Sequence, residues 1–232
     1  MEALLDWIWI LLWQIFGFLF FTLWGWLIIL FVLVPALRGR LRVYGRRRAF
    51  YRARRAELAN PRNASVRFLL GRLHFEGRQL RRALHFFREA VRIHSEHGTP
   101  VDPKLYLLLG HTLRRLGHLP EAIAAYEAGL EEAPESGRGE SETGLGIAHR
   151  KLGGEEGLAQ AERWFRRATE VNQSLLEPRV RLAALLQRRG EAEAAARLLQ
   201  EARELEVPDY LRRQERRWRV AVWVFPLISG LL

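Results

Sequence analysis

The sequence predicts an all-α protein in which an N-terminal transmembrane helix is followed by an α-solenoid of about four helix pairs. Two features of the 232-residue chain point to this architecture: a long uncharged stretch near the N-terminus, and a helix-pair pattern that occurs four times in the middle of the chain. A third feature, the absence of cysteine, excludes a disulfide framework, a thiolate metal site and a cysteine nucleophile.

The uncharged stretch covers residues 7–37, which are 31 residues without a charged side chain. A helix that crosses the hydrocarbon core of a bilayer needs about 20 apolar residues. We therefore expect one span at about 15–36 with an apolar lead-in, and a single long tilted helix is the alternative. A cleaved signal peptide is not expected, because the leader carries Glu2 and Asp6 and the apolar run is too long.

An arginine-rich segment follows at 38–55, with nine arginines and no acidic residue. Because basic flanks stay on the cytoplasmic side, we expect a single-pass protein of the inner (cytoplasmic) membrane with its N-terminus out and its repeats cytoplasmic. Arginines here also suit anionic lipid headgroups, at about 1 kcal/mol each. A solvated linker helix and a nucleic-acid arm are the alternatives, and the adjacent membrane helix disfavours nucleic acid. The expected membrane-surface residues are Arg46, Arg47, Arg48, Arg52, Arg54 and Arg55.

The repeated pattern lies within 66–208, and each copy predicts an apolar helix, a glycine-containing break and a second helix with a small–large–small triplet. Steps of four and three residues place each triplet on one helical face, where the small residues let the partner helix approach. We expect the first helices to end with positive φ at Gly77, Gly117, Gly153 and Gly190. The triplets are Ala83-Phe87-Ala90, Ala122-Tyr126-Gly129, Ala161-Phe165-Ala168 and Ala195-Leu199-Ala202.

These four segments resemble the tetratricopeptide repeat (TPR) family. The second segment resembles it best, through Leu109-Gly110, Gly117, Ala122, Tyr126 and Pro134. The first segment departs from the pattern at Ser95, where the family has proline, and the fourth has Ala183 in place of glycine. The resemblance implies a non-enzymatic scaffold that binds peptides in a concave groove lined by the first helix of each pair.

Carried over to this sequence, the groove positions of the family are mostly basic. Because residues 56–208 together carry a net charge of only +1, this positive charge is concentrated at those positions. A basic groove suits an acidic segment of a protein partner, since arginine holds carboxylates in bidentate fashion; a solvated helix face is the alternative. The resemblance implies these partner-binding residues: Arg72, His111, Arg114, Arg115, Arg150, Lys151 and Arg188.

No catalytic residue, cofactor or metal site is expected. The sequence contains no glycine-rich phosphate loop, no HExxH motif and no hydrolase elbow. His94 and His97 are three residues apart at a predicted helix end, and we interpret them as solvated residues.

The chain is expected to divide into a membrane anchor at 1–37, an Arg-rich juxtamembrane neck at 38–62, TPR-like repeats at 63–208 and a tail at 209–232. The tail begins with a basic stretch and ends in twelve uncharged, mostly apolar residues from 221. This order suits an interfacial segment, and packing on the fourth repeat or against the N-terminal helix is the alternative.

The sequence therefore predicts a membrane-anchored scaffold or adaptor that recruits a protein partner at the cytoplasmic face, with no nucleic acid expected. The layout is similar to that of the bacterial lipopolysaccharide assembly protein B family, although the cysteines of that family's metal knuckle are absent. The alternative function is that of an assembly factor or regulatory subunit of a membrane enzyme complex, which would contact the complex through its apolar ends.

Overall fold

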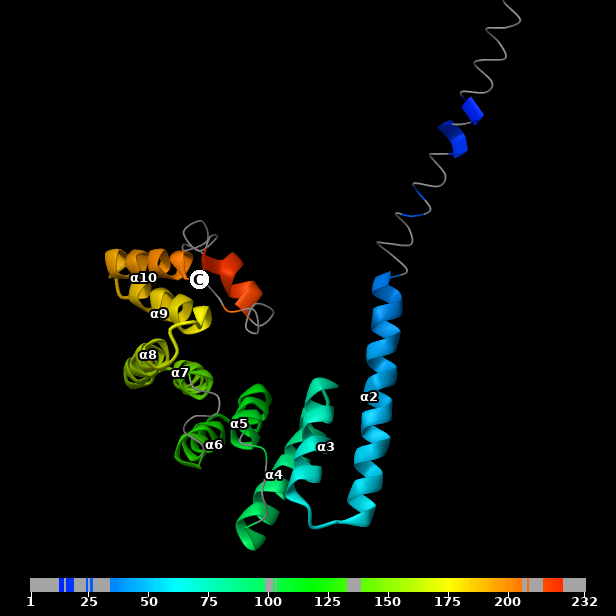
Figure 1. Ribbon diagram of the computed structural model, residues 1–232. Helices are drawn as coiled ribbons and strands as arrows, with labels where there is room; N and C mark the ends of the chain where they lie inside the picture. The colour runs from blue at the N-terminus through cyan, green and yellow to red at the C-terminus, as the bar shows by residue number, and fades with distance from the viewer. Residues whose placement is uncertain are drawn as a thin grey trace, which may run out of the picture. The chain divides into compact units, whose positions relative to one another are not determined.

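The computed structural model describes residues 34–98, 104–132, 139–205 and 215–222, and single positions or short runs at 13–14, 16–18, 24, 26, 102 and 208. Within α2, the side chains of 35–44 and of Arg46 are outside the description. The chain forms two units, residues 1–55 and 56–232, and we describe each by itself. The regular structure of the described residues is entirely helical (Figure 1).

The described residues of the first unit are helical, including those at 13–26 and the part of α2 (Val34–Ala59) that lies in this unit. Large aromatic side chains are solvent-exposed before α2: Trp13, Phe16, Phe18, Trp24 and Trp26 are between 53% and 72% exposed. The predicted span at 15–36 falls mostly outside the described residues. No helix among the described residues combines the length and the apolar character that crossing a membrane requires.

Helix α2 contains the arginines that the sequence predicts at the membrane surface. Five of the six have exposed side chains, and the side chain of Arg46 is outside the description. The neck is thus a continuous helix down to Ala59. The five exposed residues are Arg47, Arg48, Arg52, Arg54 and Arg55.

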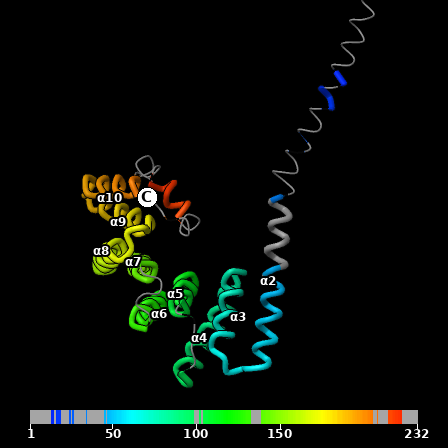
Figure 2. The backbone as a smooth tube through the Cα atoms, in the orientation of Figure 1, coloured from blue at the N-terminus to red at the C-terminus, as the bar shows by residue number. Residues whose placement is uncertain are grey.

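The second unit contains four consecutive helix pairs, as the sequence predicts. Each helix packs on the next one along the chain, and the first helices α3, α5 and α7 also contact one another in order. Figure 2 shows the chain path through this stack. The pairs are α3 (Ala64–Glu76) with α4 (Leu80–His97), α5 (Leu105–Leu116) with α6 (Leu119–Glu132), α7 (Glu140–Leu152) with α8 (Gly154–Val171), and α9 (Leu176–Arg188) with α10 (Ala192–Glu204).

The predicted triplets form the core, and every member of the four triplets is buried. In the first three pairs, the aromatic ring of the triplet lies against a glycine of the first helix. A Cβ atom built on Gly71 would lie 2.6 Å from Phe87, and one on Gly146 would lie 2.5 Å from Phe165. The fourth pair has Ala183 and Leu199 at the corresponding positions. The first helix therefore carries a Cβ here, and the side chain opposite it on the second helix is smaller than an aromatic ring.

Three of the four predicted positive φ values are confirmed, since Gly117, Gly153 and Gly190 have φ of 90°, 77° and 84°. At Gly77 the predicted end of the helix is confirmed, but the predicted positive φ is wrong, because the observed φ is −77°. Gly77 is the C-cap of α3 and its N–H donates to the Leu73 carbonyl, but the left-handed residue is Arg78 with φ of 60°. The N–H of Gln79 then closes the turn on the His74 carbonyl, so the Schellman-type ending lies one residue later than predicted.

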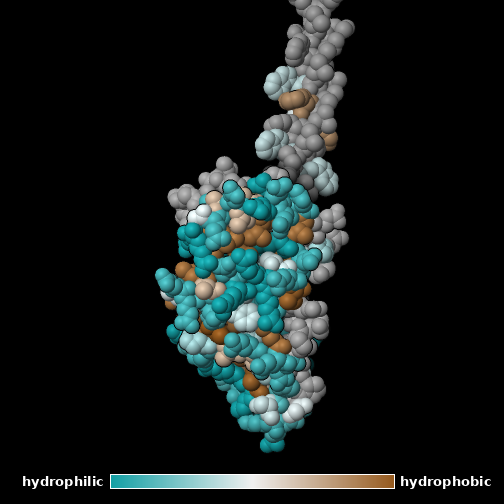
Figure 3. Space-filling view, turned by 90° about the vertical axis from the view of Figure 1, so that its left-hand side faces the viewer, coloured by the Kyte–Doolittle hydropathy of each residue, from teal (hydrophilic) through white to brown (hydrophobic). Residues whose placement is uncertain are grey.

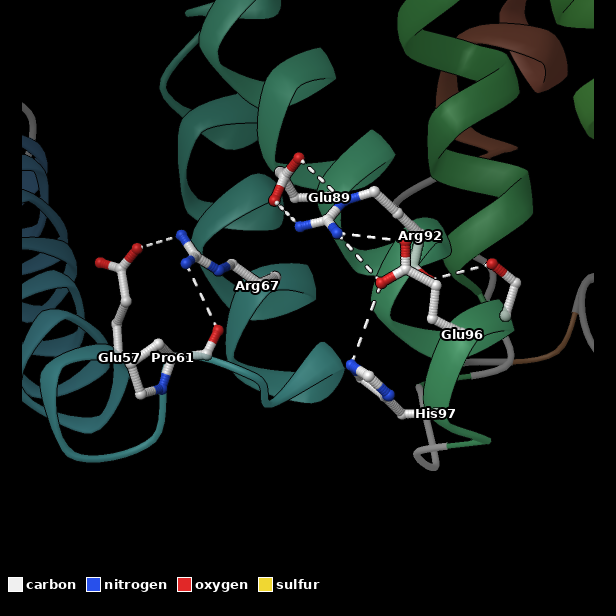
Figure 4. Close-up of polar contacts among 8 residues, drawn as sticks. Glu57, Pro61, Arg67, Glu89, Arg92, Glu96 and His97 are labelled. Atoms are coloured by element: carbon white, nitrogen blue, oxygen red, sulfur yellow. Dashed lines mark hydrogen bonds and ion pairs between the residues drawn. The ribbon is translucent and has the colours of Figure 1, made fainter.

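Polar contacts fix the start of the stack (Figure 4). The Asn63 side chain caps α3 by accepting from the Val66 N–H at 3.2 Å, and Arg67 pairs with Glu57 and donates to the Pro61 carbonyl. On α4, Arg92 lies between two carboxylates, Glu89 at 2.9 Å and Glu96 at 3.0 Å.

Each of the two histidines at the end of α4 lies close to a glutamate. His97 lies 3.9 Å from Glu96, and His94 lies 3.8 Å from Glu132. In the part of the chain that the structure describes, no group of three or more His, Asp or Glu side chains is placed to hold a metal ion.

Figure 3 shows the side of the molecule on the left of Figure 1, where the second helices α6 and α8 lie. Hydrophilic residues dominate this face, and they divide the hydrophobic residues into several separate patches. The concave side formed by the first helices is different, because a cavity opens there.

Candidate functional site

A cavity of about 330 Å³ lies among α5, α7, the start of α9 and the helix at 215–222, all within the second unit. We call this cavity the groove pocket. Three of the predicted partner-binding residues, His111, Arg114 and Arg115, form part of its wall. The remaining lining residues are Phe75, Glu140, Thr143, Gly144, Ile147, Leu175, Glu177, Pro178, Glu215 and Arg217.

A buried tyrosine supports the wall at the centre of the groove pocket. The Tyr126 ring is fully buried between two glycines, since a Cβ on Gly110 or on Gly144 would lie 2.6 Å or 2.5 Å from it. Arg114 Nε donates to the Tyr126 hydroxyl at 3.3 Å, and His111 Nδ1 lies 2.7 Å from the same oxygen. The tautomer of His111 decides whether Nδ1 donates to this hydroxyl or accepts from it.

Burial and the two neighbouring arginines keep His111 neutral. Burial, followed by the charges of Arg114 and Arg115, lowers the pKa of His111 to about 3. Burial also raises the pKa of Tyr126 to about 12. His111 thus presents a neutral ring, and the positive charge on this side of the groove pocket belongs to the two arginines.

The neutral state of His111 predicts a pH dependence of stability. Since the pKa is lower in the folded than in the unfolded chain, the unfolded chain binds more protons below pH ~6.5. Stability should therefore fall as the pH decreases from this value towards the folded pKa, by at most about 1.4 kcal/mol per pH unit. Thermal melting of the wild type and of His111→Gln between pH 7 and pH ~4 checks this: the variant should lose part of the slope, and identical slopes would contradict the assignment.

The two arginines of the pocket wall have no carboxylate partner among the described residues. Arg114 contacts the Tyr126 hydroxyl, and the Arg115 guanidinium lies over the Phe75 ring, 5.3 Å from its centroid. The two arginines form a partly apolar, positively charged wall together with Ile147 and Leu175. Such a wall suits a carboxylate attached to an apolar group.

The other predicted groove residues do not line the pocket. Arg72 is exposed, 3.9 Å from Glu76 on its own helix. Arg150 is half-buried, and burial and then the charges of Arg181 and Arg188 lower its pKa. Arg150, Arg181 and Arg188 thus form a second group of cations beside the pocket, on α7 and α9, whereas Lys151 is exposed.

Sequence reasoning missed the acidic side of the pocket, namely Glu140, Glu177 and Glu215. Glu177 pairs with Arg181 at 2.7 Å and with Arg217 at 3.6 Å. These contacts compensate the positive charge at the start of α9, so the pocket is basic on the α5 side and charge-balanced on the α9 side. Basic side chains therefore predominate only on the α5 side of the groove pocket.

The described part of the tail packs on the fourth repeat. Residues 215–222 form a helix, drawn in red beside α9 in Figure 1. Glu215 Oε2 accepts from the N–H groups of Leu176 and Glu177 at 3.0 and 3.2 Å, at the start of α9. Val222 is buried with the core of the last two repeats, and Trp218 packs against it. The expectation of an interfacial segment remains a prediction for residues 223–232, which are outside the described residues.

Comparisons with known proteins agree with this geometry. Residues 103–136, which include α5 and α6, match the sequence profile of the tetratricopeptide repeat. No curated protein sequence matches the chain.

Several solved structures share the fold at low sequence identity. MamA from Desulfovibrio magneticus RS-1 is 17% identical, covers 75% of this chain and 93% of its own, and has a TM-score of 0.60. PilF of Pseudomonas aeruginosa is also 17% identical, with 83% and 88% coverage and a TM-score of 0.60. YrrB, reported as a TPR protein with an unusual peptide-binding site, is 20% identical, with 75% and 84% coverage and a TM-score of 0.54.

Proposed function

We propose that this chain, which has one tetratricopeptide-repeat match at 103–136 and the fold of solved repeat proteins, is a membrane-anchored scaffold that binds an acidic segment of a partner protein in its concave groove. Proteins of this repeat type are in general non-enzymatic scaffolds, in agreement with the prediction that the chain is not an enzyme. The chemistry of the groove decides which partner fits it.

The observation that carries this proposal is the wall formed by Arg114 and Arg115. Two guanidinium groups without a carboxylate partner among the described residues lie beside Phe75 and Ile147 in one cavity. A peptide carboxylate would pair with the arginines while its neighbouring apolar side chain contacts the apolar wall. A peptide site in YrrB, a protein of similar fold, supports a peptide as the ligand class here.

Arg150 and Arg188 extend the positive surface beyond the pocket. Arg150 has no carboxylate partner among the described residues, and the charges of Arg181 and Arg188 lower its pKa after burial does. An acidic segment longer than the pocket would relieve this repulsion. The proposed binding surface therefore continues from α5 over α7 to α9.

Membrane anchoring rests on the first unit. The uncharged run at 7–37 is long enough for one span, and the aromatic side chains described within it are exposed, which is costly in water. The exposed arginines of α2 follow directly and suit the cytoplasmic headgroups. The full chain should stay in the membrane pellet after alkaline carbonate extraction, and its release into the supernatant would refute the anchor.

A binding experiment with the full chain in detergent tests the groove. The probe is a fluorescent glutamate-rich peptide that contains one leucine, and the measured quantity is its dissociation constant at low and high salt. Arg114→Ala/Arg150→Ala should weaken binding at least ~10-fold, because it removes two charges that attract the acidic peptide. The dissociation constant of the variant should also change less with salt, because salt screens such charges over about 8 Å at physiological ionic strength.

The matched control is Arg163→Ala/Arg197→Ala, which removes two exposed arginines from the second helices α8 and α10. It changes the net charge equally and leaves the pocket intact. Equal loss of binding in both double variants would mean that net charge, not the groove, attracts the probe. If native partners bind both variants but not a chain truncated before 217, the assembly-subunit alternative is favoured.

A further inference from the structure

The helix at 215–222 occupies one end of the concave groove and contributes Glu215 and Arg217 to the pocket wall. We propose that this helix is a displaceable internal ligand. The acceptor site at the start of α9 then takes a partner helix that carries a carboxylate and an indole three residues apart. This inference rests on the proposed function and specifies the partner.

The carboxylate half of the acceptor site is the N-terminus of α9. Glu215 is 1% exposed, and its Oε2 accepts from two successive backbone N–H groups, those of Leu176 and Glu177. Unpaired N–H groups at a helix start attract anions, and the helix dipole adds to this attraction. The site is therefore already occupied by a carboxylate, supplied by the chain itself.

The indole half of the acceptor site is formed by arginine. The Trp218 ring lies 4.8 Å from the guanidinium carbon of Arg181 and 4.9 Å from that of Arg217. Arg181 belongs to α9 of the repeat array, and its guanidinium is held by the Glu177 carboxylate at 2.7 Å. An indole on any helix docked in this position would gain the same cation–π contact with Arg181.

The internal helix fits its site imperfectly. Glu215 Oε1 and Trp218 Nε1 are buried without a hydrogen-bond partner, and they are two of the three such side-chain atoms among the described residues. An unmet buried polar atom lowers the net gain from docking. Burial also raises the pKa of Glu215, because the charged carboxylate is less stable in this buried position than in water. A partner helix whose own carboxylate and indole have all their polar atoms hydrogen-bonded would have a thermodynamic advantage over the tail.

The attachment of the tail to the array sets the threshold for displacement. A tethered segment acts at an effective concentration in the millimolar range. A free segment of the same sequence therefore competes poorly with it, and only a helix with a better fit replaces it. The tail would thus exclude weak acidic ligands from this end of the groove.

The test uses the full chain in detergent and a fluorescent peptide corresponding to residues 209–222. The Glu215→Ala/Trp218→Ala chain has an empty acceptor site and should bind this peptide at least ~10-fold tighter than the wild type, in which the tethered tail competes. The matched control is Arg216→Ala/Arg219→Ala, which alters two exposed residues of the same helix and should behave as the wild type. Equal binding to all three chains would overturn the proposal.

The partner chemistry is tested by competition. A helical peptide with glutamate and tryptophan three residues apart on an alanine–lysine background should displace the labelled peptide, whereas its glutamine/alanine counterpart should not. Failure of the first peptide to compete overturns the assigned chemistry. Concentration-dependent dimers of the wild type with exchanged tails would identify a second copy as the occupant and also overturn the proposal.

A measurement on the wild type does not depend on the folding of any variant. If the tail is displaceable, amide hydrogens of 215–222 should exchange at least ~10-fold faster than those of α9, because a docked segment that opens separately exchanges through local opening. Equal protection would overturn the proposal. If the glutamate-rich probe binds but the tail proves fixed, only this inference fails; if that probe does not bind, the proposed function fails.

Discussion

Tyr126→Ala is expected to lower the free energy of unfolding by about 3–5 kcal/mol, by analogy with buried phenylalanine. The ring is fully buried and lies between Gly110 and Gly144, so its removal leaves a cavity between two consecutive first helices. The loss combines the transfer free energy of the ring with the cost of this cavity. Chemical denaturation of the full chain measures it.

Tyr126→Phe is the matched control, because it keeps the ring and removes the hydroxyl. His111 and Arg114 then lose their common partner, and we expect a cost of about 1–3 kcal/mol. A loss from Tyr126→Ala no larger than that from Tyr126→Phe would contradict the role of the ring as the spacer between the second and third repeats.

Gly146→Ala is expected to destabilise the array by about 1–3 kcal/mol through overpacking. The new Cβ would lie 2.5 Å from the Phe165 ring, and neither helix backbone can move away without disturbing its neighbours. Gly45→Ala in α2 is the control, because a Cβ there meets no atom within 4 Å. In that control the better helix propensity of alanine should be the main effect.

The double variant Gly146→Ala/Phe165→Leu reproduces the pair Ala183 and Leu199 of the fourth repeat. If a smaller side chain on the second helix is what makes room for a Cβ on the first, the two changes should couple favourably by about 0.5–3 kcal/mol. Additive losses in the double-mutant cycle would show that the fourth repeat tolerates alanine for a different reason.

The repeat architecture could be predicted because its signal is local and recurs. Each triplet fixes one face of a second helix, and four copies in tandem leave little freedom in how the pairs stack. Even the departure at Ala183 has a structural reason, since it accompanies Leu199. The ending of α3 could not be predicted, because an arginine, Arg78, adopts the left-handed conformation next to a glycine that does not use it.

The candidate site was only partly predictable. Arg114 and Arg115 lie on the expected face of a first helix, and they line the pocket. Arg72 and Lys151 lie at related repeat positions but outside it, because successive repeats rotate relative to one another and a cavity forms only where several helices converge.

The contributions of the tail depend on contacts between residues that are distant in sequence. The Glu215 carboxylate accepts from the N–H of Leu176, which is 39 residues away in sequence. No periodic pattern in the sequence predicts such a contact. The available signal was one glutamate among arginines, three residues before a tryptophan. On a helix these two positions share a face, which indicates a docked surface rather than a solvated basic segment.

The most direct test of acidic-segment binding in the groove is site-specific photo-cross-linking of the full chain in its native cells. A photoreactive residue replaces Arg115 at the pocket wall or, as the control, Arg163 on α8, and the cross-linked peptides are identified by mass spectrometry. If the groove binds an acidic segment, position 115 captures acidic segments of a partner protein and position 163 does not. Equal yields at both positions, or captured segments without acidic residues, would contradict this binding.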